Sequence, residues 1–125
     1  MSLNYQVIPV RSAAILTGTY VAGTTIEETH GENQLVLYVD FTKGSLTTAE
    51  FKIEFSPDNT NWYQETTQSI TGGTATETVA AHQIGASGAY RILVPIKDRY
   101  IKVSAKGTGT VTASEMTITA VVGEV

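Results

Sequence analysis

The sequence predicts an all-β protein, a two-layer antiparallel β-sandwich with a jelly-roll-like arrangement of about eight strands. Three observations lead to this class. Short segments of alternating apolar and polar residues recur along the chain, turn-forming residues separate them, and no segment of helical length has a 3.6-residue period. Because no internal repeat or linker is visible, residues 1–125 are expected to form one domain, with residues 1–4 as a flexible arm.

The composition restricts the possible functions. Only 16% of the residues are charged, and Thr and Gly are abundant, as in exposed β-structure. The net charge of −4 argues against a general nucleic-acid binder. Without cysteine the chain has no disulfide and no thiolate metal site. The first residues lack a signal peptide's basic region and apolar run, and no apolar stretch is long enough to cross a membrane.

The first third of the chain predicts one strand followed by irregular segments. Residues 5–10 read as a strand, and Pro9 places it at a sheet edge or a strand end because proline cannot donate a ladder hydrogen bond. Residues 13–21 are apolar and Thr-rich. Residues 24–33 are polar and acidic, and are expected to form a long loop.

Residues 34–41 predict a strong strand with apolar residues on both faces. One face carries the fuller apolar row: Leu35, Leu37, Val39 and Phe41. The other carries Val36 and Tyr38. Such a strand is either central and covered on both faces, or half of an oligomer interface.

Residues 51–65 predict a hairpin around which the fold is organised. Phe51, Ile53 and Phe55 alternate with charged residues, which indicates a half-buried strand. Residues 56–61 supply Ser, Pro, Asp and Asn, the residue types of a tight turn. Trp62 and Tyr63 open the returning strand, either as packing residues or as a ligand platform, and packing is the favoured interpretation.

The segments after the hairpin predict further short strands. The return strand should continue through residues 66–70 to a Gly72-Gly73 turn, and residues 74–79 should form an edge strand. Residues 80–88 are small and read as a loop. Two strands are then expected, at residues 89–96 and 100–105.

The last segment predicts a turn and a closing strand. Gly107-Thr-Gly109 reads as a hairpin turn, and residues 110–122 as the last strand. Its apolar residues change parity, which predicts a β-bulge near Ser114-Glu115. The expected core comprises Phe51, Ile53, Phe55, Ile92, Val94, Ile101, Val103 and Ile118.

Residue types that carry chemistry are few. Glu28, His30 and Glu32 alternate and could present metal ligands on one side, and residues 58–61 contain oxygen ligands, but neither has the spacing of a known metal motif. His82 has no acid near it in sequence. We therefore expect no catalytic residue, no cofactor site and no metal site, and hence a non-enzyme.

Charge is unevenly distributed along the chain. Acidic residues gather at 27–32 and basic residues at 97–106. The plainer interpretation is solvated strand faces. The other is a pair of complementary surfaces that steer a partner or a second copy of the chain.

Three stretches resemble small β-sandwich structural proteins of tailed bacteriophages and prophages. They are Phe-Lys-Ile-Glu-Phe-Ser-Pro-Asp-Asn-Thr-Asn-Trp at 51–62, Gly-Ala-Tyr-Arg-Ile-Leu-Val-Pro at 88–95, and Arg-Tyr-Ile-Lys-Val at 99–103 followed by Gly107-Thr-Gly109. The first and third also resemble discoidin-like carbohydrate-binding sandwiches. The chain departs from that second pattern because it has no cysteine and few aromatics expected to be exposed beyond Trp62, Tyr63 and Tyr100.

The phage resemblance implies a virion structural protein, either a capsid decoration (cement) subunit or a head–tail accessory subunit. Such a protein would be assembled in the host cytoplasm and would bind capsid or tail proteins as a homo-oligomer, with a trimer favoured. The candidate interface residues are Val36, Tyr38, Tyr100 and Lys102. The alternative is a carbohydrate-binding module that holds a glycan on Trp62 and Tyr63.

Overall fold

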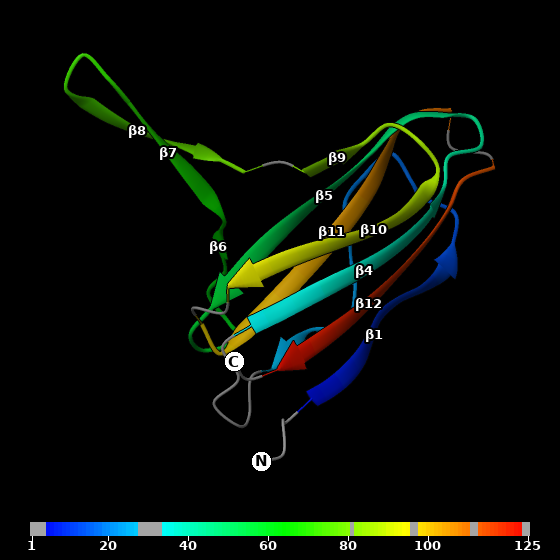
Figure 1. The fold of residues 1–125 in the computed structure, drawn as a ribbon, viewed down its shortest axis with the longest axis horizontal. Helices are drawn as coiled ribbons and strands as arrows, with labels where there is room; N and C mark the ends of the chain where they lie inside the picture. Colours follow the sequence, from blue (N-terminus) through cyan, green and yellow to red (C-terminus); the bar gives the residue numbers. More distant parts are fainter. Residues whose placement is uncertain (1–4, 28–33, 81, 96–97, 111–112, 124–125) are drawn as a thin grey trace.

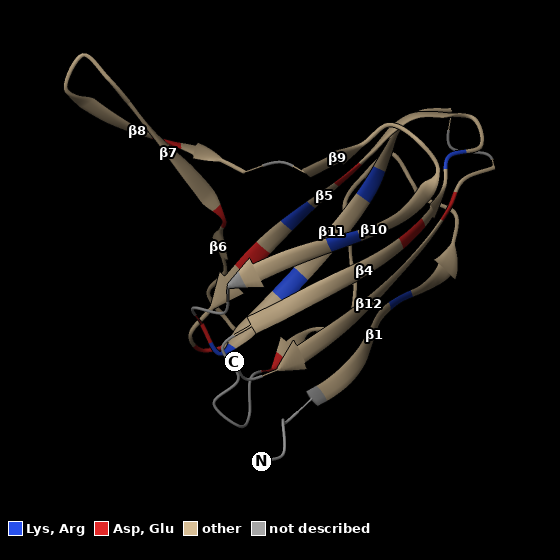
Figure 2. Cartoon of the chain, in the orientation of Figure 1, with Lys and Arg blue, Asp and Glu red and all other residues tan. Residues whose placement is uncertain are grey.

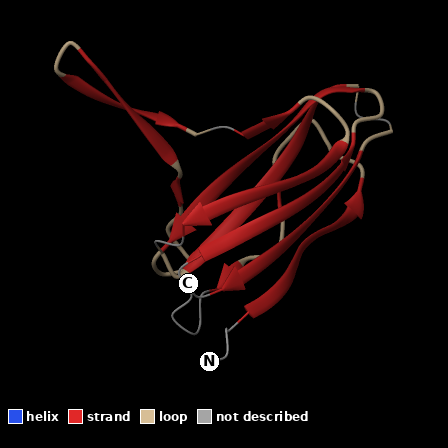
Figure 3. Cartoon of the chain, viewed as in Figure 1, coloured by secondary structure: helices blue, strands red, loops and turns tan. Residues whose placement is uncertain are grey.

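The computed structural model describes residues 5–27, 34–80, 82–95, 98–110 and 113–123. In this part of the chain the regular elements are all strands, which form two antiparallel sheets packed face to face and a separate two-stranded ribbon (Figures 1 and 3). The predicted all-β sandwich is therefore confirmed. None of the described residues belongs to a helix with the length and apolarity that crossing a membrane requires.

The first sheet, sheet A, has four long strands in the order β1-β12-β4-β10. Their bounds are β1 (Tyr5–Ala14), β12 (Glu115–Gly123), β4 (Gln34–Thr42) and β10 (Gly88–Pro95). Pro9 lies in β1, an edge strand of this sheet, as predicted, and the β1–β12 register shifts just after it. β4, the strand with two apolar faces, is central, between β12 and β10.

The second sheet, sheet B, is built on two long central strands, β5 (Leu46–Ser56) and β11 (Tyr100–Gly109). Two short strands, β2 (Val21–Ala22) and β3 (Ile26–Glu27), pair with the free side of β11. Two more, β6 (Tyr63–Gln64) and β9 (His82–Ile84), pair with the free side of β5. Each edge of sheet B is thus a strand position occupied by two separate segments.

The remaining two strands form a ribbon of their own, β7 (Thr66–Thr71) paired with β8 (Thr74–Val79). Figure 1 shows this ribbon projecting from the sandwich. It is inserted between β6 and β9, which share one strand position on β5. We call β7 and β8 with their turn the arm.

The strand order is that of a jelly roll. Outside the arm the described residues form ten strands. If β2 and β3 count as one position and β6 and β9 as another, these ten strands fill eight positions. In chain order these positions form the sheets 1-8-3-6 and 2-7-4-5, which is the double Greek key of a jelly roll. The expected number of strands holds for the sandwich. The two strands of the arm and its Gly72-Gly73 turn were predicted, but their departure from the sandwich was not.

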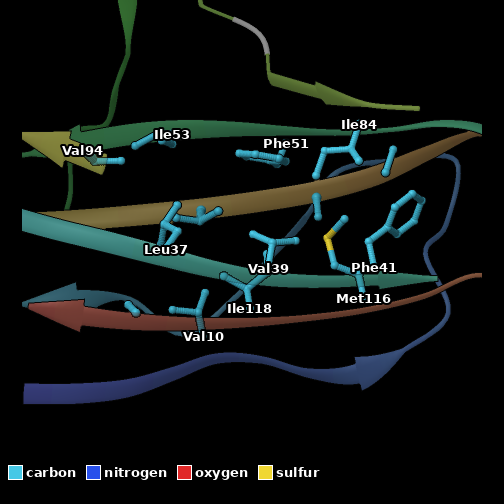
Figure 4. Packing of buried hydrophobic residues seen from close by; sticks show 14 of the residues in the cluster. Val10, Leu37, Val39, Phe41, Phe51, Ile53, Ile84, Val94, Met116 and Ile118 are labelled. Atoms are coloured by element: carbon cyan, nitrogen blue, oxygen red, sulfur yellow. The ribbon is translucent and has the colours of Figure 1, made fainter. Parts of the chain in front are cut away.

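The core lies between the two sheets, as Figure 4 shows. The fuller row of β4 points inward, and all four of its side chains are buried. Of the eight predicted core residues six are buried: Phe51, Ile53, Val94, Ile101, Val103 and Ile118. Phe55 and Ile92 are only partly buried and pack against the edge of this cluster.

Two predictions near the C-terminus are wrong. Gly107 is not in a hairpin turn but lies inside β11, where it pairs with Ala49 and donates its backbone N–H to the carbonyl of Thr17 at 2.8 Å. The last strand begins at Glu115, so Ser114 belongs to the connection before β12 and the change of parity needs no bulge. Glycine permits a close backbone approach as well as a turn, and the sequence does not distinguish the two.

Candidate interaction surfaces

The outward face of sheet A carries one candidate surface. The outward residues of β4 include Val36, which is partly buried, and Tyr38, which is 41% exposed. β4 lies between β12 and β10, so neighbouring strands extend this outer face on both sides of it. The candidate interface residues Val36 and Tyr38 are thus together on this face, as their shared parity predicted.

An apolar row crosses all four strands of this face. The backbone register places Val7 of β1 opposite Val121 of β12, Val121 opposite Val36 of β4, and Val36 opposite Leu93 of β10. Val7 is 66% exposed and Leu93 is 52% exposed. We call these four residues the apolar row. Four aligned aliphatic side chains on an outer sheet face are a feature of interaction surfaces more than of isolated subunits.

A second row with a basic residue runs beside the apolar row. The register aligns Pro9, Thr119, Tyr38 and Arg91 in this order. Next to this row the surface has a shallow hollow of about 240 Å³. Its lining includes Tyr38, Arg91, Asp40 and Ala89, and the small side chain of Ala89 leaves space there. Arg91 is exposed and makes no ion pair with any residue that the structure describes.

The other two candidate interface residues, Tyr100 and Lys102, lie on the opposite side of the sandwich. Both are in β11 of sheet B, with side chains alternating against the buried Ile101 and Val103. The four candidate residues therefore do not form one surface. Parity within a strand is readable from sequence, but the sheet to which each strand belongs depends on the topology.

The outward face of sheet B is a charged ladder. Acidic and basic residues alternate along β5, and the two lysines of β11, Lys102 and Lys106, lie opposite Glu54 and Glu50 (Figure 2). Lys52 lies 3.7 Å from Glu54 and Lys106 lies 3.4 Å from Glu50. At one end Arg99 pairs with Glu27 at 2.8 Å. Charges from the acidic and basic segments thus meet within one chain, which favours the interpretation as solvated strand faces.

Aromatic rings lie among these charges. The Nζ of Lys102 is 4.3 Å from the centroid of the Trp62 ring, and Trp62 is partly buried. The Nζ atoms of Lys52 and Lys106 each lie 4.8 Å from the Tyr20 ring. These distances are in the range of cation–π contacts. Tyr20 was not expected to take part in a site, and nothing near it in sequence indicates that two lysines of other strands would meet it.

The candidate ligand platform is divided. Trp62 is covered by Lys102 against its own sheet, whereas Tyr63, the first residue of β6, is 61% exposed. Trp62 is partly buried but does not belong to the core cluster. The reason is parity, since the return strand begins one residue after Trp62 and the ring lies toward the charged face.

In the turn before Trp62, side-chain oxygen atoms accept hydrogen bonds from the turn itself. The carboxylate of Asp58 accepts hydrogen bonds from the backbone N–H groups of Thr60 and Asn61 at 2.9 and 2.8 Å, and from the side-chain amide of Asn61 at 2.8 Å. These bonds hold the pKa of Asp58 well below its ordinary value, with the backbone donors as the main cause. Residues 58–61 are thus a self-capped turn.

His82 does have an acidic neighbour, from a distant part of the chain. Its Nε2 lies 2.9 Å from Oε1 of Glu65, and its ring stacks on Phe51. The described residues contain no group of three His, Asp or Glu side chains placed to hold a metal ion. The predicted pattern of Glu28, His30 and Glu32 lies outside the described residues.

The chain was compared with known proteins and solved structures. No protein-family model and no curated protein matches the sequence. Among solved structures the fold is similar to the crystal structure of PBSX exported protein XepA, with a TM-score of 0.65 and 13% sequence identity. The match covers 96% of this chain and 37% of the XepA chain, so this chain spans little more than a third of that protein.

Proposed function

We propose that this chain is a non-enzymatic structural protein of a phage particle, a capsid decoration subunit or a head–tail accessory subunit. The observation that carries the proposal is the jelly-roll sandwich with the likeness to XepA, a protein of phage PBSX. Jelly rolls are frequent in viral capsid proteins. The resemblance of residues 51–62, 88–95 and 99–103 to phage structural sandwiches points the same way.

The surfaces of the molecule support a role in assembly. The apolar row offers an aliphatic strip on the outer face of sheet A, and the hollow beside it is open and shallow. Partly apolar faces without a deep pocket suit contacts between proteins, while small-molecule sites are concave. A homo-oligomer, with a trimer favoured by the phage resemblance, would bury such a face by closed symmetry.

A carbohydrate-binding module is the second candidate. Exposed Tyr63 favours it, because an exposed aromatic ring beside polar side chains such as Asn61 can stack on a sugar. The cover of Lys102 over Trp62 counts against a two-ring platform. A glycan array with the wild-type chain and Tyr63→Ala separates the two candidates.

The proposal is tested on particles of the phage or prophage whose genome encodes the chain. Peptides of the chain should appear in gradient-purified particles in a fixed ratio to the major capsid protein. Deletion of its gene should give particles that lack only this component or that lose stability. A chain that stays in the soluble fraction when particles sediment would contradict the proposal.

A further inference from the structure

The arm is a ribbon without cover among the described residues. Every residue of β7 and β8 is exposed, and Ile70 reaches 70%. Gly72 and Gly73 form its two-residue turn with φ angles of 58° and 80°, the positive values of a tight hairpin. An isolated two-stranded hairpin is at best marginally stable in water. A ribbon held outside its sandwich would therefore gain stability from packing against another surface.

The two faces of the arm differ. Residues directly opposite one another in an antiparallel ribbon share a face. One face carries only hydroxyl side chains: Thr67, Ser69, Thr71, Thr74, Thr76 and Thr78. The other, which we call the mixed face, carries three rows: Thr66 with Val79, Gln68 with Glu77, and Ile70 with Ala75. The mixed face thus carries at least one apolar side chain at each end and an acid in the middle.

The outward residues of β10 repeat this order with the opposite charge. Leu93 belongs to the apolar row, Arg91 follows, and Ala89 lies at the hollow. Successive residues on one face of a strand are about 6.6 Å apart. The arm strand β8 offers Val79, Glu77 and Ala75 at the same spacing. The apolar–acidic–apolar series of β8 therefore matches the apolar–basic–small series of β10 residue by residue.

Among the residues that the structure describes, neither charge in this match is paired with an opposite charge. Glu77 accepts hydrogen bonds from the hydroxyl of Thr66 at 2.9 Å and the amide of Gln68 at 3.1 Å, both neutral groups. Arg91 has no ion pair with a described residue. Asp40 is an acid on the same face, and it lies opposite Ala89 rather than Arg91.

We propose that the arm of one copy lies on the outer face of sheet A of a second copy, with Glu77 against Arg91 and Val79 against Leu93. Ile70, opposite Ala75 on the ribbon, then covers the hollow beside Tyr38. Because the arm points away from its own sandwich, the contact joins two chains (Figure 1). Because the contact joins two different surfaces of the subunit, repeated contacts form a closed ring when the rotation between neighbouring subunits is a whole fraction of a turn. This inference rests on the homo-oligomer of the proposed function and identifies the contact between its subunits.

A charge exchange tests the pairing of Glu77 with Arg91. Sedimentation velocity at micromolar concentrations should give an oligomer for the wild-type chain. Glu77→Arg or Arg91→Glu alone should raise the dissociation constant by about tenfold or more, because like charges are then juxtaposed. The double variant should restore it. Thr76→Arg is the control, since it places the same arginine side chain on the hydroxyl face of the arm and should leave the mass unchanged.

Removal of the arm tests the contact as a whole. Replacing residues 66–79 by Asn-Gly keeps the backbone hydrogen bond from Ala80 to Glu65, at 2.9 Å, and should leave a folded monomer. A wild-type monomer, an armless chain with wild-type mass, or a double variant without recovery would each overturn the proposal. If a monomeric wild-type chain is still found in purified particles, the arm contact fails while the proposed function stands.

Discussion

The imidazole ring of His82 lies parallel to the ring of Phe51, with the centroids 5.0 Å apart and the planes within 4° of each other. Phe51 is buried in the core, and Nε2 of the same imidazole lies 2.9 Å from Glu65, the residue before β7. His82 itself follows the arm and begins β9. The two ends of the arm are therefore joined to each other and to the core at one place.

We expect the protein to be less stable when the His82 ring is removed from this junction. His82→Ala removes the stacked ring and should lower the free energy of unfolding by about 0.5–1.5 kcal/mol, the range of an aromatic pair. Urea unfolding at neutral pH measures the change. Gln83→Ala, an exposed neighbour on the same strand, is the control and should change it by less than about 0.5 kcal/mol. Equal effects of the two substitutions would contradict a structural role for the stack.

Asp58 predicts a specific acid dependence. Its pKa is lower in the folded chain than in the unfolded chain, so its carboxylate stabilises the fold above the ordinary aspartate pKa of about 4, and this stability is lost as the pH falls further. Asp58→Asn should therefore lower the melting temperature at neutral pH. The difference from wild type should shrink in acid below about pH 4. A difference independent of pH would mean that the carboxylate charge is not what holds the turn.

The core predicts unequal effects for two phenylalanines of β5. Phe51→Ala should cost about 3–5 kcal/mol, because Phe51 is fully buried. Phe55→Ala should cost less, since Phe55 is only partly buried at the edge of the cluster. Chemical unfolding of both variants gives the comparison. A larger loss for Phe55 would place the core toward the other end of the sandwich.

The contact of Lys102 with Trp62 separates packing from ligand binding. Trp62→Ala should lower the melting temperature, because the ring covers part of sheet B beneath Lys102. The variant and the wild-type chain should be equally inactive on a glycan array. Unchanged stability with the loss of a glycan signal would support the carbohydrate-binding module instead.

The sequence is informative where one chain segment determines the answer. The alternation in β4 and β5 predicts the inward rows, and Gly72-Gly73 predicts its turn. It is less informative where segments distant in sequence meet. Thr66–Thr71 reads as a continuation of the hairpin that β5 begins. In the structure only the two residues of β6 pair with β5, and Thr66–Thr71 pairs with β8 outside the sandwich instead. The pairing of His82 with Glu65 and the position of Tyr20 between two lysines likewise depend on the sheet topology.

The most direct test of the structural role is the protein content of phage particles. Quantitative mass spectrometry of gradient-purified particles should find this chain in a fixed, integral ratio to the capsid or tail protein that it contacts. Washing with detergent and low salt should not remove it. Absence of the chain from such particles, while it is abundant in the soluble fraction of the same lysate, would contradict the account.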